Sequence, residues 1–300
     1  MIKSILTVAL MSLSALAKPV DLVYRFDLDT PATFEMIQTM NQSQVSPGMT
    51  ATTTTVSTNR IVTELIETRD DGTLVIGNTT KSVVFEMTGA GLDMSYDSEN
   101  PADVSKLANP TIASLAALKG IQIQLHLDKT GTILDVPNID DIHDRVLDMK
   151  DPAMLDMMIT FTDEDTIIAM NEANYKLLPT KPVEIGDHWN RTFDIPTGDI
   201  QITMNFELTL DAITGKRDKR IAEISIDGTM TIDYGEDLAD VLTVVESSMS
   251  GSAEFNIHDG LFDSLTINTL LKNEMNYSGG ELPDMTISVN QSVQNTRVDD

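Results

Sequence analysis

The feature that most constrains the fold of this chain is an alternation of apolar and polar side chains that recurs along most of its length. Between residues 121 and 127, every second residue is Ile or Leu and the residues between them are polar. The stretches 50–67 and 74–87 are rich in Thr, Val and Ile, and the turn Asp70-Asp71-Gly72 separates them. A period of two places alternate side chains on opposite faces of a strand. The pattern therefore predicts an antiparallel sheet with one wet face.

The same alternation continues elsewhere in the chain. From Leu22 to Leu28, apolar residues alternate with charged Arg25 and Asp27, which predicts a half-buried strand. Six segments of the second half are predicted as strands: 183–195, 200–212, 220–232, 241–257, 261–277 and 285–298.

The second half also repeats features of the first half in the same order. Three pairs of segments resemble each other: 24–36 and 189–205, 60–64 and 220–224, and 123–134 and 253–265. The second pair leads to Asp71-Gly72 in one half and Asp227-Gly228 in the other, and both are interpreted as turns. Three matches in one order indicate a duplicated β-module. The alternative is that hairpins in any antiparallel meander look alike, because Asp-Gly is a common hairpin turn.

The middle of the chain carries helix patterns instead. Residues 102–119 contain helix-forming and small residues, and Pro110 is expected to begin a new helix there or to kink this one. Three sets of residues are typical of helix N-termini: Asn138, Asp151 with Pro152, and Thr162 with Asp165. The last of these helices is expected to reach about Lys176, before Pro179.

Together these patterns predict an α+β protein that is mostly antiparallel β. We expect two related β-modules, as a curved sheet or half-barrel, with a helical insert packed against the sheet. The expected N-terminal β-module spans residues 18–137 with one helix near 102–119, the helical insert spans 138–180, and the C-terminal β-module spans 181–300.

Residues 1–17 are predicted to be a signal peptide. Lys3 is followed by an apolar stretch over 5–13 and by the small-residue cleavage pattern Ala15-Leu16-Ala17. This stretch is too short for a comfortable membrane span, and no second run is long enough. The chain has no cysteine, so its folding needs no oxidising compartment. We therefore expect a periplasmic or extracellular protein, cleaved near Ala17 and without a transmembrane segment.

The charge of the chain is strongly negative. It has 47 Asp and Glu residues against 20 Lys and Arg residues, a formal net charge of −27. This balance disfavours binding to nucleic acid or to anionic lipid surfaces. A solubilising surface explains it, and a specific cationic partner is the alternative.

The sequence lacks the common motifs of catalysis and metal binding. It contains no G-x-S-x-G, H-E-x-x-H, G-K-[ST] phosphate loop or EF-hand loop, so we assign no catalytic residue, metal or cofactor. The histidines are far apart in sequence and are interpreted as structural, with His143 on the exposed side of an acidic helix: His126, His143, His188 and His258. Asp163-Glu164-Asp165 is interpreted as a helix start. Met154 and Met157 have the spacing for a Cu(I) site, but adaptable packing, or a yielding surface against an apolar ligand, is the more common use of methionine.

Two short motifs are more specific than these patterns. The first contains Tyr96, Asp97, Ser98 and Pro101, and the second contains Leu178, Pro179, Pro182, Val183, Gly186, Asp187 and Trp189. Together they resemble a domain-of-unknown-function family of exported bacterial proteins with Y-D-S-x-x-P and L-P-x-x-P-V-x-x-G-D-x-W motifs. The resemblance implies a β-rich exported architecture and no particular activity. These positions are candidate binding residues, but a helix cap at Asp97 or Ser98 and a turn at Gly186-Asp187 explain them structurally.

The leading functional hypothesis is a non-enzymatic exported protein that holds an apolar or lipid-like molecule between a curved sheet and methionine-bearing helices. The expected architecture resembles periplasmic lipid and lipoprotein carriers, in which helices cover an open half-barrel. One alternative is a hydrolase that uses carboxylates gathered from loops. Another is a scaffold that binds envelope components through sheet edges or duplicated halves. A cavity between sheet and helices would distinguish the carrier from these alternatives.

Overall fold

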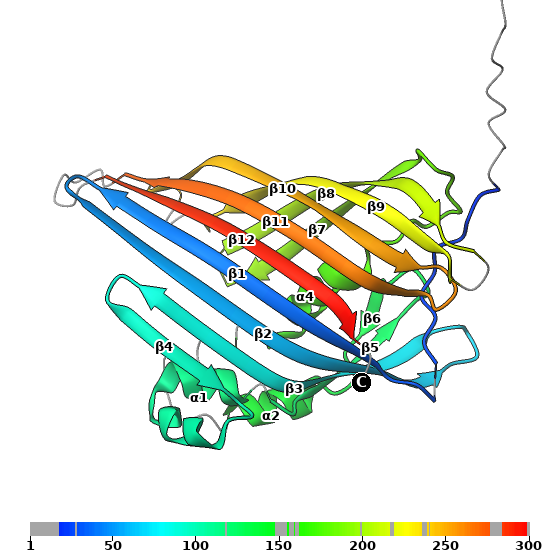
Figure 1. Ribbon diagram of the computed structural model, residues 1–300, viewed down its shortest axis with the longest axis horizontal. Coiled ribbons are helices and arrows are strands. Elements are labelled where there is room, and N and C mark those ends of the chain that lie inside the picture. The colour runs from blue at the N-terminus through cyan, green and yellow to red at the C-terminus, as the bar shows by residue number, and fades with distance from the viewer. Residues whose placement is uncertain are drawn as a thin grey trace, which may run out of the picture.

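Twelve antiparallel strands form one curved, unclosed sheet in the computed structural model of the chain (Figure 1). The structure describes residues 18–27, 29–117, 119–147, 155, 159, 162–198, 200–216, 219–235, 239, 241–276 and 284–298. The predicted signal peptide, residues 1–17, lies outside this range.

Six strands come from each half of the sequence. The first half contributes β1 (Ala32–Ser46), β2 (Met49–Thr68), β3 (Leu74–Gly89), β4 (Leu92–Asp97), β5 (Gln122–Leu127) and β6 (Ile133–Asp135). The second half contributes β7 (His188–Thr197), β8 (Ile200–Thr214), β9 (Ile221–Asp233), β10 (Leu242–Asn256), β11 (Leu261–Met275) and β12 (Met285–Val298). The order across the sheet is β6-β5-β3-β2-β1-β12-β11-β10-β9-β8-β7, with β4 paired to β3 beside this path. The predicted fold class, mostly antiparallel β in a curved sheet, is confirmed.

The two predicted β-modules are contiguous parts of this sheet. They join where β1 pairs with β12, from Thr33 opposite Val298 to Val45 opposite Thr286. One of the three resemblances between the halves is weaker than expected, because Asp227-Gly228 lies inside β9 and is not a turn. A Cβ on Gly228 would lie 2.6 Å from the Asn205 carbonyl oxygen and 2.8 Å from the Phe206 ring. This glycine therefore serves close strand packing, and the duplication itself stays a prediction.

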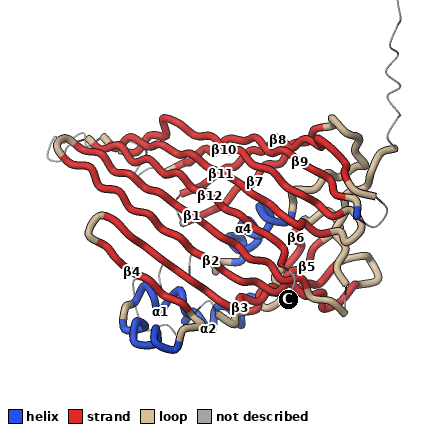
Figure 2. The backbone as a smooth tube through the Cα atoms, viewed as in Figure 1, coloured by secondary structure: helices blue, strands red, loops and turns tan. Residues whose placement is uncertain are grey.

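Four helical segments with described bounds lie at one edge of the sheet and on one of its faces (Figure 2). They are the 3-10 helix η1 (Pro101–Ala108) and the α-helices α1 (Pro110–Ala117), α2 (Ile139–Leu147) and α4 (Glu164–Tyr175). Pro110 begins α1, as predicted. Asp151-Pro152, the predicted start of another helix, lies outside the described residues.

Two of the predicted helix caps are wrong in detail. The N-cap of α4 is Asp163, whose carboxylate accepts hydrogen bonds from the backbone N–H groups of Asp165 and Thr166. The expected capping box of Thr162 and Asp165 does not form, because the Thr162 hydroxyl donates to the Ile159 carbonyl. The Asn138 side chain accepts from the Gln124 N–H at 2.9 Å and donates to the Gln122 carbonyl at 2.7 Å. Asn138 therefore ties the start of α2 to β5.

The strand predicted between Leu22 and Leu28 is also wrong over its described part, and Leu28 lies outside the described residues. The segment is extended, but its backbone bonds go to different partners: Val20 pairs with Val183, the Tyr24 N–H donates to Lys129, and the Arg25 N–H donates to Gly260. A Cβ on Gly260, whose φ is +67°, would lie 2.4 Å from the Arg25 nitrogen, so only glycine allows this approach. Leu22 and Tyr24 are buried. The alternation in this segment therefore reflects the burial of alternate side chains, although the backbone does not pair as a strand of the sheet.

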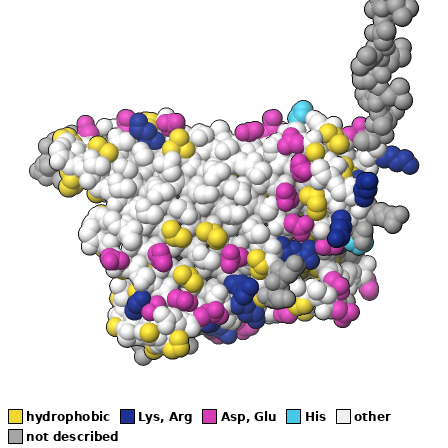
Figure 3. Space-filling model, viewed as in Figure 1, with side chains coloured by type: hydrophobic (Ala, Val, Ile, Leu, Met, Phe, Trp, Pro, Cys, Tyr) yellow, Lys and Arg dark blue, Asp and Glu magenta, His cyan; other side chains and the backbone are white. Residues whose placement is uncertain are grey.

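The strand register fixes which side chains share a face. Met36 of β1 pairs with Asn59 of β2 and with Asn295 of β12, and all three lie on the face that α4 covers. The next residue, Ile37, pairs with Thr58 and Gln294 on the opposite, outer face. The middle of that outer face shows few charged side chains (Figure 3). It carries short polar residues such as Thr39, Ser292 and Asn268. The predicted wet face is thus hydroxyl- and amide-rich.

Candidate ligand cavity

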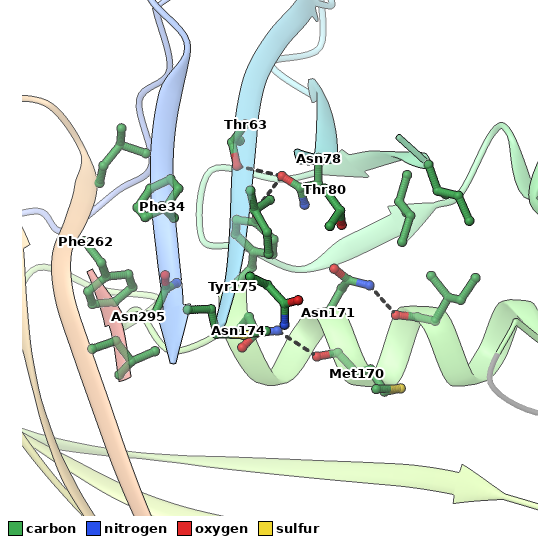
Figure 4. A pocket seen from close by; sticks show the side chains of 18 of the residues that line it. Phe34, Thr63, Asn78, Thr80, Met170, Asn171, Asn174, Tyr175, Phe262 and Asn295 are labelled. Carbon is green, nitrogen blue, oxygen red and sulfur yellow. Dashed lines mark hydrogen bonds between the residues drawn. The ribbon is translucent and has the colours of Figure 1, made fainter. Parts of the chain in front are cut away.

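A cavity of about 530 Å³ lies between the sheet and α4. Its volume falls within the range of about 300–1,000 Å³ that small-molecule sites occupy. Figure 4 shows Phe34, Phe262 and Asn295 on the strand side of the cavity and Met170, Asn171 and Asn174 along the helix. The cavity therefore occupies the place where the carrier hypothesis expects one.

The lining is apolar with a minority of neutral polar groups. The aliphatic and aromatic hydrocarbon side chains and the methionines that line it are Phe26, Phe34, Met36, Ile61, Ile121, Ile123, Ile142, Ile167, Met170, Leu261, Phe262 and Leu265. The polar ones are Tyr24, Asn59, Thr63, Asn78, Thr80, Thr162, Asn171, Asn174, Tyr175 and Asn295. None of these described lining residues is Asp, Glu, Lys, Arg or His.

Local structure explains how these residues meet. Residues that pair across neighbouring strands share a face, so Ile61 and Thr80 point to the cavity together, as do Thr63 and Asn78. On α4, Met170 and Asn171 recur one turn later as Asn174 and Tyr175, which is the spacing of one helix face. The sheet thus forms one wall of the cavity and this helix face forms the other.

Tyr175 closes a small hydrogen-bond network on this wall. Its hydroxyl donates to Asn78 Oδ1 at 3.0 Å, and the Thr63 hydroxyl donates to the same oxygen at 2.7 Å. Burial raises the pKa of Tyr175, and the hydrogen bonds with Asn78 and Thr63 partly oppose that rise. The Tyr175 hydroxyl is therefore neutral and already has a partner.

Tyr24 is more deeply buried than Tyr175, but its hydroxyl has no hydrogen-bond partner among the described residues. Its ring stacks on Phe26 at 5.9 Å between centroids and meets Tyr175, Phe255 and Phe262 edge-on at 5.8–6.1 Å. Burial, followed by the influence of Tyr175, raises the pKa of Tyr24 well above its ordinary value of 10.0. The Tyr24 hydroxyl and Asn295 Oδ1 are both buried without a hydrogen-bond partner among the described residues.

The two tyrosines provide a matched test of this difference. Tyr24→Phe is expected to raise the free energy of unfolding of the ligand-free protein by about 1 kcal/mol, because it removes a buried hydroxyl that has no partner. Tyr175→Phe is expected to lower it by about 1 kcal/mol, because it breaks the bond to Asn78. Urea denaturation of the two variants would measure both changes. A loss of stability in Tyr24→Phe equal to that in Tyr175→Phe would show that the Tyr24 hydroxyl has a partner after all.

The first sequence motif lies away from the cavity. Tyr96 is buried in β4, the Ser98 hydroxyl accepts the Val83 N–H, and Pro101 begins η1. The N-cap of η1 is Asn100, so the expectation of a cap at Asp97 or Ser98 is wrong. The Asp97 carboxylate accepts instead from the Glu99 N–H. None of these four motif residues lines the cavity.

The second motif lies where the chain leaves α4 and enters β7. Gly186, at φ +93°, donates its N–H to Leu210, and the Asp187 carboxylate accepts the Glu184 N–H. The indole N–H of Trp189 donates to the Leu177 carbonyl at 2.8 Å. Beside it, Arg191 donates to the carbonyls of Lys176 and Leu178. Two side chains of β7 therefore hold three consecutive carbonyls after α4, and so position the helix that covers the cavity. Pro179 and Pro182 lie in this connection and do not line the cavity.

Trp189→Phe tests this attachment. The variant keeps an aromatic ring but leaves the Leu177 carbonyl, in a residue that is 1% exposed, without its donor. We expect the free energy of unfolding to fall by about 1–3 kcal/mol, measured by circular dichroism in urea. Exposed His188→Ala, one residue earlier on the strand, should change it by less than about 0.5 kcal/mol. Equal effects of the two substitutions would contradict the proposed role of the indole N–H.

The carboxylates and histidines considered as candidate functional residues lie outside the cavity lining. Asp259 and Asp263 share Arg297 and Asn256 at the β10–β11 turn, and burial raises the pKa of Asp263 while Arg297 opposes the rise. His126 is buried between Arg69 and Asp135. His143 is not a free surface residue as expected, because its Nε2 donates to the Thr162 carbonyl at 2.6 Å and ties α2 to the start of α4.

The described part of the chain has neither a metal-binding cluster nor a helix that could cross a membrane. It contains no cluster of three or more His, Cys, Asp or Glu side chains placed to hold a metal ion. No helix in that part has the length and apolar character needed to cross a membrane. The methionines Met154 and Met157 lie outside the described residues.

The sequence contained signals for only some of the residues that line the cavity. Alternation placed Phe34, Met36 and Ile61 on strand faces, but it could not show that β1 would pair with β12 and bring Asn295 to the same face. Tyr24 fell in a wrongly predicted strand. The spacing of Met170, Asn171, Asn174 and Tyr175 on one helix face was the signal that could have identified the helical wall.

The sequence of residues 71–262, which include both short motifs, matches DUF6263, a family of unknown function, and the chain belongs to this family. None of the curated proteins compared with the chain matches it. A structure titled "Lipid-protein interactions in lipovitellin" is 10% identical with a TM-score of 0.44, and the match covers 92% of this chain but only 26% of that one.

Two further solved structures match over most of their length. OccK5 (OpdH) of Pseudomonas aeruginosa is 7% identical with a TM-score of 0.24, and the match covers 91% of this chain and 100% of that one. The COG4313 outer membrane channel of Pseudomonas putida F1 is 9% identical with a TM-score of 0.21, and the match covers 93% and 99% of the two chains. Similarity at this level assigns no function to the chain.

Proposed function

We propose that this protein binds an apolar, lipid-like molecule in the cavity between the sheet and α4, and that it does so as a non-enzymatic carrier or receptor of the bacterial periplasm. The observation that carries the proposal is the lining of this cavity of about 530 Å³, in which apolar side chains outnumber polar ones and none of the described lining residues is charged. Transfer of an apolar molecule from water into such a space is favourable. The export pattern of residues 1–17 supports the proposed location.

The chemistry of the polar lining also favours binding over hydrolysis. Its groups are amides and hydroxyls, and burial keeps the hydroxyls of Tyr24 and Tyr175 protonated. The paired carboxylates Asp259 and Asp263, which a carboxylate-based hydrolase would use, are bridged by Arg297 and do not line the cavity.

Titration of the purified chain with diphenylhexatriene tests the proposal. This probe is a pure hydrocarbon that fluoresces in apolar surroundings. We expect saturable binding of one probe per chain, because the cavity between the sheet and α4 is a defined space of about 530 Å³ that one probe molecule can fill. Fluorescence that rises without saturation, or that does not rise, would overturn the proposed function. Native mass spectrometry of the freshly purified protein would report any molecule carried from the host.

The affinity for diphenylhexatriene should not depend on pH between about pH 5 and pH 9, because the titratable groups among the described lining residues are tyrosines, whose pKa is raised above 10.0. A raised pKa keeps a phenol protonated and neutral to a higher pH, so neither tyrosine changes charge within that window. Probe titrations across the window check this, and a clear inflection would place an ionising group in the cavity.

A further inference from the structure

We propose that the cavity selects an uncharged amphiphile that carries a hydroxyl group, and that it discriminates against fatty carboxylates and alkylammonium ions. This inference rests on the proposed binding function and specifies its ligand class. Two independent observations carry it: the neutrality of the lining and two buried polar atoms that have no partner.

The neutrality of the lining contrasts with the rest of the chain. The sequence has 47 acidic and 20 basic side chains, yet none of them lies among the described residues of the cavity wall. A charged group that entered would lose its hydration and find no opposite charge, which is costly whichever sign it has. The wall therefore disfavours both signs of charge.

Unpartnered polar atoms on the lining support a polar group in the ligand. Five buried side-chain atoms of the described residues have no hydrogen-bond partner: those of Thr55, Tyr234 and Asn273 lie outside the cavity lining, whereas the Tyr24 hydroxyl and Asn295 Oδ1 belong to lining side chains from the N-terminal segment and from β12. Buried polar atoms in folded proteins almost always have a hydrogen-bond partner, so these two indicate a partner that the ligand supplies. One of them can donate and the other can accept, and a hydroxyl group can satisfy either.

Four other polar side chains of the lining already have hydrogen-bond acceptors within the protein. Tyr175 and Thr63 both donate to Asn78, and the side-chain amides of Asn171 and Asn174 donate to carbonyls of α4 itself. The hydrocarbon part of the ligand would then lie against Phe34, Phe262 and Met170 (Figure 4).

Displacement of bound diphenylhexatriene by three ten-carbon compounds tests the selection by charge. Decan-1-ol is neutral, whereas at about pH 7.5 decanoate is anionic and decylamine is cationic. We expect decan-1-ol to displace the probe at a concentration at least about tenfold lower than either ion. If an ion displaces the probe as well as decan-1-ol, or if decan-1-ol does not displace it, this inference fails while the proposed function stands. If the probe itself does not bind, the proposed function fails.

Tyr24→Phe tests the hydrogen-bonding part. Diphenylhexatriene has no polar atom, so the affinity of each variant for it, measured in parallel, separates a change in apolar packing from the loss of the hydroxyl. The concentration of decan-1-ol needed for displacement, corrected for that affinity, should rise about fivefold to tenfold, which corresponds to the loss of one hydrogen bond. Tyr96→Phe, which removes a phenol hydroxyl outside the cavity lining, should leave that concentration within about twofold. Equal displacement curves for Tyr24→Phe and the unchanged chain would show that the Tyr24 hydroxyl does not contact the ligand.

Discussion

Replacing Phe255 with alanine is expected to lower the free energy of unfolding by about 3–5 kcal/mol. Phe255 is 0% exposed, and its ring meets Tyr24 at 6.1 Å and Phe262 at 5.1 Å between centroids. Truncation would remove the ring that packs against Tyr24 and Phe262, two of the aromatic side chains that line the cavity, and would leave a void there. Urea denaturation followed by circular dichroism would measure the loss.

Leu134→Ala is the control for this variant. Leu134 lies in β6 and is 55% exposed, so its truncation should change the free energy of unfolding by less than about 0.5 kcal/mol. A Phe255→Ala loss no larger than that of Leu134→Ala would contradict the aromatic cluster as part of the core. We also expect Phe255→Ala to weaken probe binding, because Tyr24 and Phe262 would lose their support.

The second large effect concerns the cavity itself. Met36→Trp places a large ring inside the cavity, so we expect the affinity for diphenylhexatriene to fall by at least about tenfold, which is about 1.4 kcal/mol. Ile37→Trp adds a ring at the next residue of the same strand, but on the outer face, and should leave the affinity within about twofold. Fluorescence titration of the two variants measures both values.

This pair separates binding in the cavity from binding to any exposed apolar surface. Both residues are half-buried in β1, and they differ in the face to which the register assigns them. Equal losses of affinity in the two variants, or a larger loss in Ile37→Trp, would mean that the probe binds outside the cavity.

Much of the sheet could be predicted because strands leave a local record in the sequence. The alternation from Ile121 to Leu127 yields β5, and Asp71-Gly72 is a turn, with Gly72 at φ +87°. The failures have a common cause. The segment from Leu22 to Phe26 alternates because its apolar side chains are buried, yet its backbone N–H groups donate to two distant residues, Lys129 and Gly260. Gly228 reads as a turn residue but serves close packing against Phe206. The alternation of apolar and polar residues indicates which side chains are buried. It does not indicate which distant segment the backbone will pair with.

The location of the cavity could be predicted from the sequence, but the residues that line it could not. A space between sheet and helices follows from one-sided strands and an amphipathic insert, and Met170 does face it. The neutral wall depends on the register of β1 with β12, which join residues more than two hundred positions apart and leave no local signal. The role of Trp189 could be anticipated only as a residue at a seam, because its acceptor is a backbone carbonyl.

A crystal structure of the chain grown with decan-1-ol would test the central claim most directly. We predict one molecule of the alcohol between α4 and the sheet, in contact with Phe34 and Phe262 and with its oxygen within hydrogen-bond distance of the Tyr24 hydroxyl or of Asn295 Oδ1. A structure in which α4 packs onto the sheet with no space between them, or in which the alcohol binds only elsewhere, would contradict the account.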